Sequence, residues 1–409
     1  MCPCLPSAPL EEGMSLKNLT VEDARARMLG AATRTGAHTL ALAEADGATL
    51  AEDIHATRDQ PPFDASAMDG WAVIGDPVEG DQLTIAGESA AGRGHEGRLE
   101  LGQAVRIFTG AAVPAGATRV VIQEDTERNG DTVRITRPPS PGANIRRAGG
   151  DFQAGALLLA AGTRLDPWRL SLAAAAGRDT LQVSARPTIA ILATGEELVS
   201  PGGQPGPFQI FESGGAGLVP MIARWGGLAH RLAPARDDED AIAAAVAGAD
   251  AELIVTVGGA SVGDYDLVKP ALKRLGLELQ VESINVRPGK PTWFGTLADG
   301  RRVLGLPGNP ASAFVCAELF LKPLIAAMSG GAAGPLLEPA ILAADLPAAG
   351  PREHWMRAIL GPEGVRALPD QDSSLVTVFA AADALMRRRA NAPAEKAGAL
   401  VEILRLNRS

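Results

Sequence analysis

A strand pattern that ends in two glycines constrains this chain more than any other stretch. Residues 253–266 read LIVTVGGASVGDYD, an apolar and β-branched run that stops at Gly258-Gly259, and a helix-like segment follows at 267–275. Glycines let the backbone approach an anion closely, and the N-terminus of a helix offers unpaired N–H groups. The carboxylate of Asp266 suits Mg²⁺ instead. The stretch therefore predicts a phosphate-binding turn at the end of a buried strand.

Strands and helices alternate around this stretch. Strands are expected at 188–193, 229–233, 277–285, 292–296 and 303–306, with helices at 218–225, 241–247 and 311–328. This alternation predicts a mostly parallel sheet that is covered by helices on both faces. Ligands of such sheets bind beyond the carboxyl ends of the strands. Four polar or glycine-rich loops should therefore meet at one site, namely 194–197, 236–237, 258–266 and 307–310.

The remainder of the chain is rich in short strands and turns. Residues 15–35 read as a helix that Thr20 caps. Short strands lie between Gly, Pro and Asp turns over residues 71–160, and Asn129-Gly130 predicts a hairpin between strands at 119–122 and 133–135. Another short helix is expected at 169–177, and the strands after residue 339 predict a small all-β C-terminal domain.

Length, charge and cysteine content narrow the class of protein. A chain of 409 residues is too long for one ordinary core, so we expect roughly two to four domains. A net charge of −10 disfavours a general nucleic-acid binder. The sequence lacks an uncharged apolar run of about 18 residues, so no membrane span is expected. The cysteines Cys2, Cys4 and Cys316 give no disulfide framework and fit a reducing cytoplasm, and Cys316 lies on an apolar helix face typical of a core.

Two polar loops of the β-rich region leave more than one interpretation open. Residues 61–73 read PPFDASAMDGWAV, where Asp64 and Asp69 could cap turns or take part in chemistry. Arg146-Arg147, beside glycines, could clamp an anion or form part of a solvated surface. The residues alone do not decide between these alternatives.

Seven motifs, in order along the chain, resemble the MoeA family of molybdopterin molybdenumtransferases, which is related to the E domain of gephyrin. They are PFDASAMDG at 62–70, FTG at 108–110, NIRR at 144–147, TGEEL at 194–198, GGASVG at 258–263, RPGKP at 287–291 and LPGNP at 306–310. The resemblance extends over roughly residues 15–405, and the number and spacing of the motifs make it specific.

The resemblance implies a multidomain α/β plus β fold with four parts. These are an N-terminal helix and linking domain at 15–60 with 146–185, a β-rich inserted domain at 61–145, a three-layer α/β/α molybdopterin-binding domain with a mostly parallel sheet at 186–330, and a C-terminal β-barrel-like domain at 335–409. It also implies a cytoplasmic, elongated homodimer. Its site would lie between the sheet domain of one subunit and the β-rich domain of the other.

The reaction that the resemblance implies is the insertion of molybdate into adenylylated molybdopterin, which releases AMP and molybdenum cofactor with the help of Mg²⁺ or a similar cation. Cleavage of a phosphoanhydride needs charge neutralisation more than covalent help. The implied partners are molybdopterin adenylyltransferase and proteins of molybdoenzyme maturation. The resemblance implies binding to neither nucleic acid nor a membrane.

The same resemblance implies roles for individual residues. The implied catalytic residues are Asp69, Thr109, Asp151 and Asp266, and the implied metal ligands are Glu197, Asp237 and Asp266. The implied substrate-binding residues are Gly258, Gly259, Ser261, Gly263, Arg287, Lys290, Pro307, Gly308, Asn309 and Pro310.

One segment departs from the family pattern. The family usually has Asp-Ser/Thr-Asn after the TGEE segment, whereas residues 211–215 read FESGG here. Glu212 keeps a carboxylate at this place, but Gly214 removes an amide side chain. A non-catalytic paralogue that binds molybdopterin or its molybdenum cofactor, or that serves as a scaffold, is the alternative function.

Overall fold

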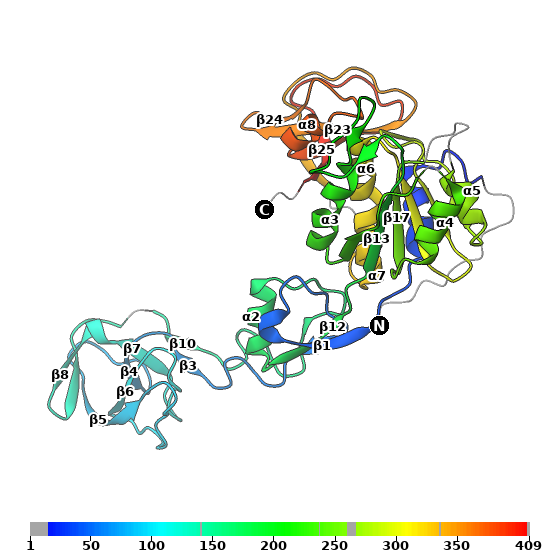
Figure 1. Ribbon diagram of the computed structural model, residues 1–409. Coiled ribbons are helices and arrows are strands. Elements are labelled where there is room, and N and C mark those ends of the chain that lie inside the picture. Colours follow the sequence, from blue (N-terminus) through cyan, green and yellow to red (C-terminus); the bar gives the residue numbers. More distant parts are fainter. Residues whose placement is uncertain (1–14, 140, 237, 260–266, 335–336, 407–409) are drawn as a thin grey trace.

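The computed structural model describes residues 15–139, 141–236, 238–259, 267–334 and 337–406. Figure 1 shows an extended molecule in which a β-rich part lies at one end and a larger α/β part at the other, with a small linking part between them. The C-terminal strands pack on the α/β part at the far side from the linking part.

The α/β part is built on a six-stranded sheet. Its strand order is β16 (Leu228–Arg231), β13 (Thr188–Ala193), β17 (Leu253–Val257), β21 (Arg302–Leu306), β20 (Trp293–Thr296) and β18 (Glu278–Val281). The first four strands are parallel, and β20 runs antiparallel to both β21 and β18. The prediction of a mostly parallel sheet is therefore confirmed.

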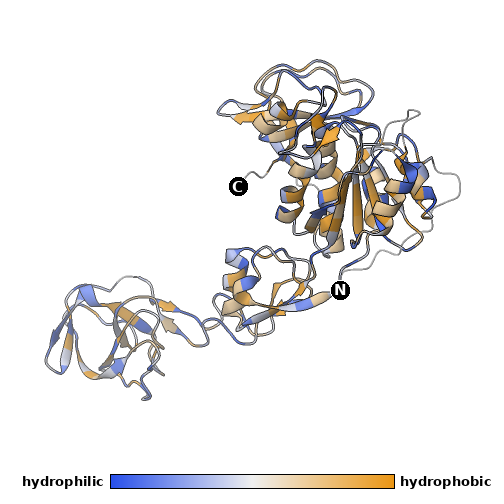
Figure 2. Ribbon diagram, viewed as in Figure 1, coloured by the Kyte–Doolittle hydropathy of each residue, from blue (hydrophilic) through white to orange (hydrophobic). Residues whose placement is uncertain are grey.

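Helices cover both faces of this sheet because alternate residues of its buried strands face opposite sides. On one face, Ile189 and Ile191 of β13 join a core with α1 (Val21–Gly30), α3 (Gly214–Arg224), α6 (Pro310–Cys316) and α7 (Lys322–Met328). On the other face, Ala190 and Leu192 pack with α4 (Glu239–Ala247) and α5 (Val268–Lys273). Figure 2 shows the apolar character of the central strands.

The helix after β21 is continuous from residue 310 to 328 but changes its winding. The segment η3 (Ala317–Leu321) is π-helical and joins α6 to α7. Pro323 has no N–H to donate to the carbonyl four residues earlier, and its ring crowds that carbonyl, so a wider turn relieves the helix. The whole helix is long and apolar enough to span a membrane, yet 83% of its apolar window is buried inside the protein.

Two of the expected boundaries are wrong for a tertiary reason. The predicted helix at 15–35 is confined to α1, although Thr20 does cap it by accepting a hydrogen bond from the Asp23 N–H. The predicted strand at 277–285 is confined to β18. The cause is shared, because Leu16 and Leu19 bond instead to the backbone of residues 282–285.

The β-rich part holds a second six-stranded sheet. Its order is β7 (Arg119–Ile122), β4 (Gly70–Val73), β6 (Gln103–Ile107), β5 (Gln82–Ser89), β9 (Thr132–Ile135) and β8 (Thr126–Asn129). The expected hairpin partner is wrong: Asn129-Gly130 joins β8 to β9, and β7 pairs with β4. The turn η2 (Gln123–Asp125) follows β7 and separates it from β8, which is the first strand of the hairpin.

The linking part has a small core of its own between three short pairs and a helix. The pairs are β1 (Ala37–Ala41) with β12 (Thr180–Ser184), β2 (Ile54–His55) with β11 (Leu157–Leu159), and β3 (Ala65–Ser66) with β10 (Ile145–Arg146), the last at the junction with the β-rich part. The short turn η1 (Leu42–Glu44) follows β1. The helix expected at 169–177 is α2 (Pro167–Ala175), which starts earlier because Asp166 caps it.

The C-terminal part is a third sheet that reaches back into the α/β part. It runs β19 (Val286–Arg287), β23 (Glu353–Gly361), β25 (Ala384–Arg388), β26 (Leu400–Arg405) and β22 (Leu337–Ile341), and β24 (Gly364–Ala367) also pairs with β23. The short helix α8 (Val376–Ala381) was not expected. Because β19 belongs to this sheet, Arg287 lies where the two parts meet.

A buried arginine fastens the C-terminal part to α1. Arg387 forms ion pairs with Glu353 at 3.0 Å and with Glu22 of α1, and its guanidinium lies 5.7 Å from the centroid of the Trp355 ring. Glu353 is only 8% exposed. If Arg387 were lost, the buried carboxylate of Glu353 would therefore lose its ion pair and keep the Trp355 indole N–H, which donates to it at 2.8 Å.

We predict that Arg387→Ala lowers the free energy of unfolding by about 3 kcal/mol, the usual cost of breaking a buried ion pair from one side. Arg389→Ala, which removes a pair with Glu402 from an exposed arginine, should cost less than about 1 kcal/mol. Urea unfolding of both variants tests this. Equal losses in the two would show that Arg387 does not fasten the parts together.

Candidate functional site

The four expected loops converge at the carboxyl edge of the central sheet. Gly258 has φ +97°, and a Cβ there would lie 2.6 Å from the carbonyl oxygen of Thr194. Gly308 faces it, since a Cβ at 308 would lie 3.4 Å from the Gly258 Cα. A β-bridge between Thr194 and Ala235 brings the loop after β16 alongside. A glycine is needed at 258 because of its left-handed φ and the close Thr194 carbonyl, whereas a Cβ at 308 would make an ordinary van der Waals contact.

Part of the expected constellation lies outside the described residues, namely Asp237, Ser261, Gly263 and Asp266. Their roles stay predictions. Of the expected metal ligands, Glu197 alone is described; it is exposed, and its carboxylate folds over Gly195. Over the described ranges, His, Cys, Asp and Glu form no group of three that could hold a metal ion.

The loop with Arg287 and Lys290 is fixed against α6. Gly289 has φ +116°, and a Cβ there would overlap the Sγ of Cys316. Cys316 is fully buried and accepts a hydrogen bond from the Thr292 hydroxyl at 3.1 Å, and burial raises its thiol pKa to about 12. The expectation that Cys316 is a core residue is confirmed. Both Arg287 and Lys290 are exposed above it.

The C-terminal part contributes directly to this edge. Pro310 occupies the first turn of α6, and Asn309 uses its side-chain amide to donate to the Ser373 hydroxyl at 2.9 Å. Ser373 lies in the loop after β24 that precedes α8. The α6 N-terminus, the Pro307–Pro310 motif and this loop therefore form one surface.

A buried arginine beside this surface was missed by sequence reasoning. Arg357 of β23 has no exposed surface, and its Nε and Nη1 find no hydrogen-bond partner among the described residues. Its Nη2 donates to the carbonyl of Asp372 at 3.0 Å. Burial and then the charge of Arg287 lower the pKa of Arg357.

The same surroundings also disfavour a positive charge on a second side chain. His354 also has a buried Nε2 without a partner in the described part of the chain, and burial followed by the charge of Arg287 lowers its pKa to about 4. A local excess of positive charge next to unpaired donors is an anion-binding environment. The sequence did contain a signal for Arg357. In HWMRAIL at 354–360, this arginine lies at one of the alternating positions that face inward in an otherwise apolar strand.

The other half of the expected site lies in the β-rich part. Asp69 Oδ1 accepts hydrogen bonds from the Thr109 N–H and hydroxyl, both at 2.7 Å, and these two bonds lower the pKa of Asp69. Asp69 is therefore ionised at neutral pH. The guanidinium of Arg106 lies beside it, 4.8 Å from the Phe108 ring centroid.

Asp64 and Arg147, for which the sequence leaves two interpretations open, contact each other. Arg147 and Asp64 form an ion pair at 2.6 Å, and Asp64 also accepts from the Ala148 N–H. That N–H and the Arg147 guanidinium lower the pKa of Asp64. The pair joins two loops, so neither residue stands alone as an anion clamp. Asp151 is exposed just beyond these loops and bonds through its N–H to Gln60.

Within one chain the two halves are far apart. Figure 1 shows β3, β4 and β10 at the end of the molecule that is opposite to β17 and α6. The structure therefore brings Gly258, Gly259 and the 307–310 motif together with Arg287 and Arg357, but it separates them from Asp69, Thr109 and Asp151.

The segment at 211–215, which differs from the expected pattern, is one packing unit. It follows the short pair β14 (Leu198–Val199) and β15 (Ile210–Phe211). Glu212 is 2% exposed, accepts from the Gly215 N–H and forms an ion pair with Arg231. A Cβ on Gly215 would lie 3.3 Å from both Glu212 carboxylate oxygens. Glu212 therefore serves the fold and limits the space for a side chain at 215, whereas a Cβ at 214 would first meet Val257 Cγ1, at 3.1 Å.

Comparison with protein families matches nearly the whole chain. The MoeA N-terminal region (domain I and II) matches residues 19–177, the probable molybdopterin binding domain matches 190–327, and the MoeA C-terminal region (domain IV) matches 339–406.

Characterised relatives share one name. The chain is similar to the molybdopterin molybdenumtransferase of Nostoc sp., with 36% identity covering 71% of this chain and 69% of the relative. It is 37% identical to molybdopterin molybdenumtransferase 2 of Mycobacterium tuberculosis, covering 79% and 83%. Among solved structures, the molybdopterin biosynthesis moeA protein from Pyrococcus horikoshii OT3 has a TM-score of 0.83 at 26% identity, covering 95% of this chain and 100% of that one.

We predict that Gly289→Ala lowers the free energy of unfolding by at least about 2 kcal/mol, because the new methyl group meets Cys316 and its backbone is in the left-handed region. Gly300→Ala is the matched control, since Gly300 has φ +88° and open space around it. The control should cost about 1 kcal/mol or less.

The double variant Gly289→Ala with Cys316→Ala should regain part of the loss, with a coupling of at least about 1 kcal/mol. Denaturant unfolding of the single and double variants measures this coupling. Additive losses would contradict the packing of this loop on α6.

Proposed function

The chain belongs to the MoeA family of molybdopterin molybdenumtransferases, and we propose that it transfers molybdate to adenylylated molybdopterin, releasing AMP and molybdenum cofactor. Molybdopterin adenylyltransferase would supply the substrate, and proteins that mature molybdoenzymes would take the product. Such a reaction sequence fits a cytoplasmic location.

The buried guanidinium of Arg357 is the observation that carries this proposal. Two of its nitrogens lack partners among the described residues, and Arg287 adds a second positive charge nearby. The charges of Asp370 and Asp372 act on Arg357 in the opposite sense but do not offset its burial and the charge of Arg287, and an incompletely paired buried charge is costly. A small dianion such as molybdate would supply the missing charge and accept from the unpaired N–H groups.

The neighbouring edge of the sheet suits the nucleotide phosphates. The close approach of Gly258 and Gly308 exposes backbone rather than side chains, and α6 directs its N-terminus to the same edge. Backbone N–H groups and a helix N-terminus stabilise phosphate charge. Arg287 and Lys290 would hold molybdate next to the phosphoanhydride that breaks.

A divalent cation is part of the proposal. Carboxylates are the ligands that Mg²⁺ prefers, and Glu197 at this edge, together with Asp237 and Asp266, would hold it. When bound, Mg²⁺ would neutralise charge on the phosphate oxygens as the anhydride breaks. Asp69, kept ionised by Thr109, would orient the reacting groups from the other side.

A complete site requires a second copy of the chain. Asp69 and Thr109 lie far from Gly258 in one chain (Figure 1). In a homodimer with two-fold symmetry, the β-rich part of one subunit would meet the sheet edge of the other. Each dimer would then hold two composite sites.

The reaction is tested with purified protein, molybdate, Mg²⁺ and adenylylated molybdopterin. We expect AMP release that depends on molybdate and Mg²⁺, together with reconstitution of an apo-molybdoenzyme. A folded protein that binds molybdopterin but releases no AMP would establish the scaffold function instead.

We predict that Arg357→Met weakens molybdate binding at least about tenfold while the free energy of unfolding stays unchanged or rises. The reason is that the variant removes an incompletely paired buried charge and keeps the apolar volume. Calorimetric titration with molybdate and thermal unfolding measure the two effects. Arg366→Met, on β24 and half exposed beside Glu363, is the control and should change neither. Wild-type molybdate affinity in Arg357→Met would remove this residue from the site.

The composite site predicts complementation between inactive subunits. At a molybdate concentration far below the dissociation constant of the Arg357→Met variant, this variant and Asp69→Ala should each be nearly inactive, yet an equilibrated mixture should regain about a quarter of the wild-type rate measured at the same concentration. About half of the dimers are then mixed, and one of the two sites in each is intact. AMP release from the mixture measures this. No recovery, with exchange of subunits confirmed, would place the whole site within one chain.

A further inference from the structure

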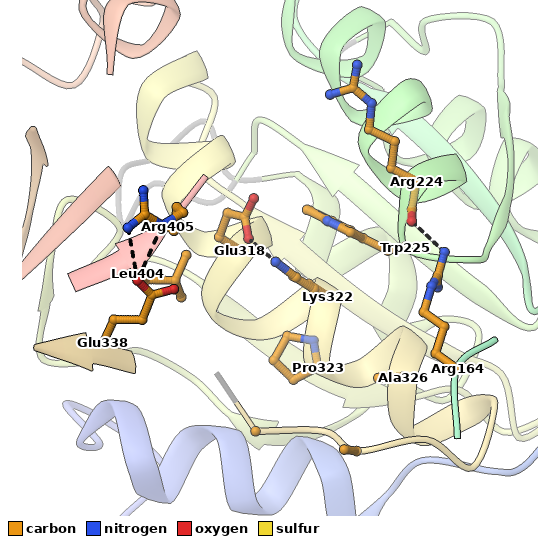
Figure 3. A pocket seen from close by; sticks show the side chains of 12 residues that line it. Arg164, Arg224, Trp225, Glu318, Lys322, Pro323, Ala326, Glu338, Leu404 and Arg405 are labelled. Atoms are coloured by element: carbon orange, nitrogen blue, oxygen red, sulfur yellow. Dashed lines mark hydrogen bonds and ion pairs between the residues drawn. The ribbon is translucent and has the colours of Figure 1, made fainter. Parts of the chain in front are cut away.

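A cavity of about 340 Å³ lies where the linking, α/β and C-terminal parts meet, away from the sheet edge described above. It is lined by the C-terminal end of α3, by η3 and α7, by β22 and β26, and by Arg164 from the linking part. The N-terminus of α3 lies at the sheet's carboxyl edge beside Glu212, so its C-terminal end faces the opposite edge. Figure 3 shows this cavity.

The charges of this cavity do not balance. Glu318 pairs with Lys322 at 3.0 Å, and Glu338 pairs with Arg405 at 3.1 Å. Arg164 is left over: within the described residues it forms no ion pair, and its Nη2 donates to the carbonyl of Arg224 at 2.8 Å. The lining remains positive even without the Arg224 guanidinium, which points away from Lys322 in Figure 3.

The position of Arg164 is built into the fold. A Cβ at Gly226 would lie 2.9 Å from its Nη1, so the guanidinium packs directly against the backbone that ends α3. Arg186 approaches the same backbone and donates to the Gly227 carbonyl at 2.6 Å. Burial and then the charge of Arg186 lower the pKa of Arg164, and the charge of Asp46, which forms no ion pair with it, opposes them only in part. A bound anion would offset both effects.

The remaining lining is flat and largely apolar. The indole of Trp225 borders the cavity, and the Lys322 ammonium lies 5.9 Å from its ring centroid. Pro323, Ala326 and Leu404 supply apolar surface. The π-helical turn of η3 belongs to the same wall and places Glu318 there. Such turns are frequent at binding sites.

We propose that this cavity is a second binding site, specific for a small organic anion that combines a flat ring with a phosphate or carboxylate. The ring would stack on Trp225, and the anionic group would pair with Arg164. The volume lies at the small end of the range for ligand sites, which suits one ring and one anionic group. Neither the stacking on Trp225 nor the pairing with Arg164 depends on the molybdate chemistry proposed above.

The test is calorimetric titration of the whole protein with phenyl phosphate, alongside inorganic phosphate and benzyl alcohol. We expect phenyl phosphate to bind at least about tenfold more tightly than either control compound, because only it engages both Trp225 and Arg164. Trp225→Leu and Arg164→Gln should each weaken the binding at least about tenfold.

Matched variants at exposed positions show whether a loss of binding is specific to the cavity. Trp168→Leu removes an indole that is 83% exposed, and Arg128→Gln removes an exposed arginine that, like Arg164, donates to a carbonyl; neither should alter binding. If Arg164→Gln fails to fold, Arg405→Gln replaces it, since the Arg405 pair with Glu338 is half exposed. No binding up to about 10 mM phenyl phosphate, or binding that Trp225→Leu leaves unchanged, would overturn the proposal.

Discussion

The parallel register of three strands decides where the chemistry of this chain can lie. Ala193 of β13 pairs with Val257 of β17, and Val257 pairs with Leu306 of β21, so the three strands end level. The chain therefore leaves the sheet at adjacent points, and the loops after these strands meet. Because Gly258 lacks a Cβ, the Thr194 carbonyl can approach it. The α6 helix starts at the same edge, and the loop with Arg287 is packed against it through Cys316.

Buried charges serve two different purposes in this structure. Arg387 is surrounded by the carboxylates of Glu22 and Glu353, and the buried Glu212 carboxylate pairs with Arg231, whose side chain is partly exposed. The charges of such pairs hold elements together and are not available to a ligand. Within the described part of the chain, the guanidinium of Arg357, on the strand next to that of Arg387, has only a carbonyl as a hydrogen-bond partner. Whether the charge and N–H groups of a buried arginine are paired therefore distinguishes a structural role from the anion-binding role proposed for Arg357.

The extended shape separates Asp69 and Thr109 from the sheet edge within one chain. The linking part has its own small core, so it can hold the β-rich part away from the α/β part rather than fold it back. Asp69 and Thr109 are pre-oriented by their mutual hydrogen bonds before any partner arrives. The proposed two-fold assembly would bring these residues to a sheet edge, because each copy presents both halves.

The sequence by itself determined the class of each part and most of the sheet edge. Alternating apolar strands and helices set the three-layer part, and glycine motifs located the loops that meet, because backbone conformation and periodicity are local properties. Tertiary structure alone decided the rest. Residues 282–285 leave their expected strand because Leu16 and Leu19 bond to them, and Asn129-Gly130 joins β8 rather than β7 to β9. Likewise, the structural role of Glu212 is apparent only from its contact with Arg231, and the proposal that Arg357 binds an anion rests on buried N–H groups that lack partners among the described residues. A side chain's role depends on neighbours that are distant in the sequence, and the spacing of residues along the chain does not record them.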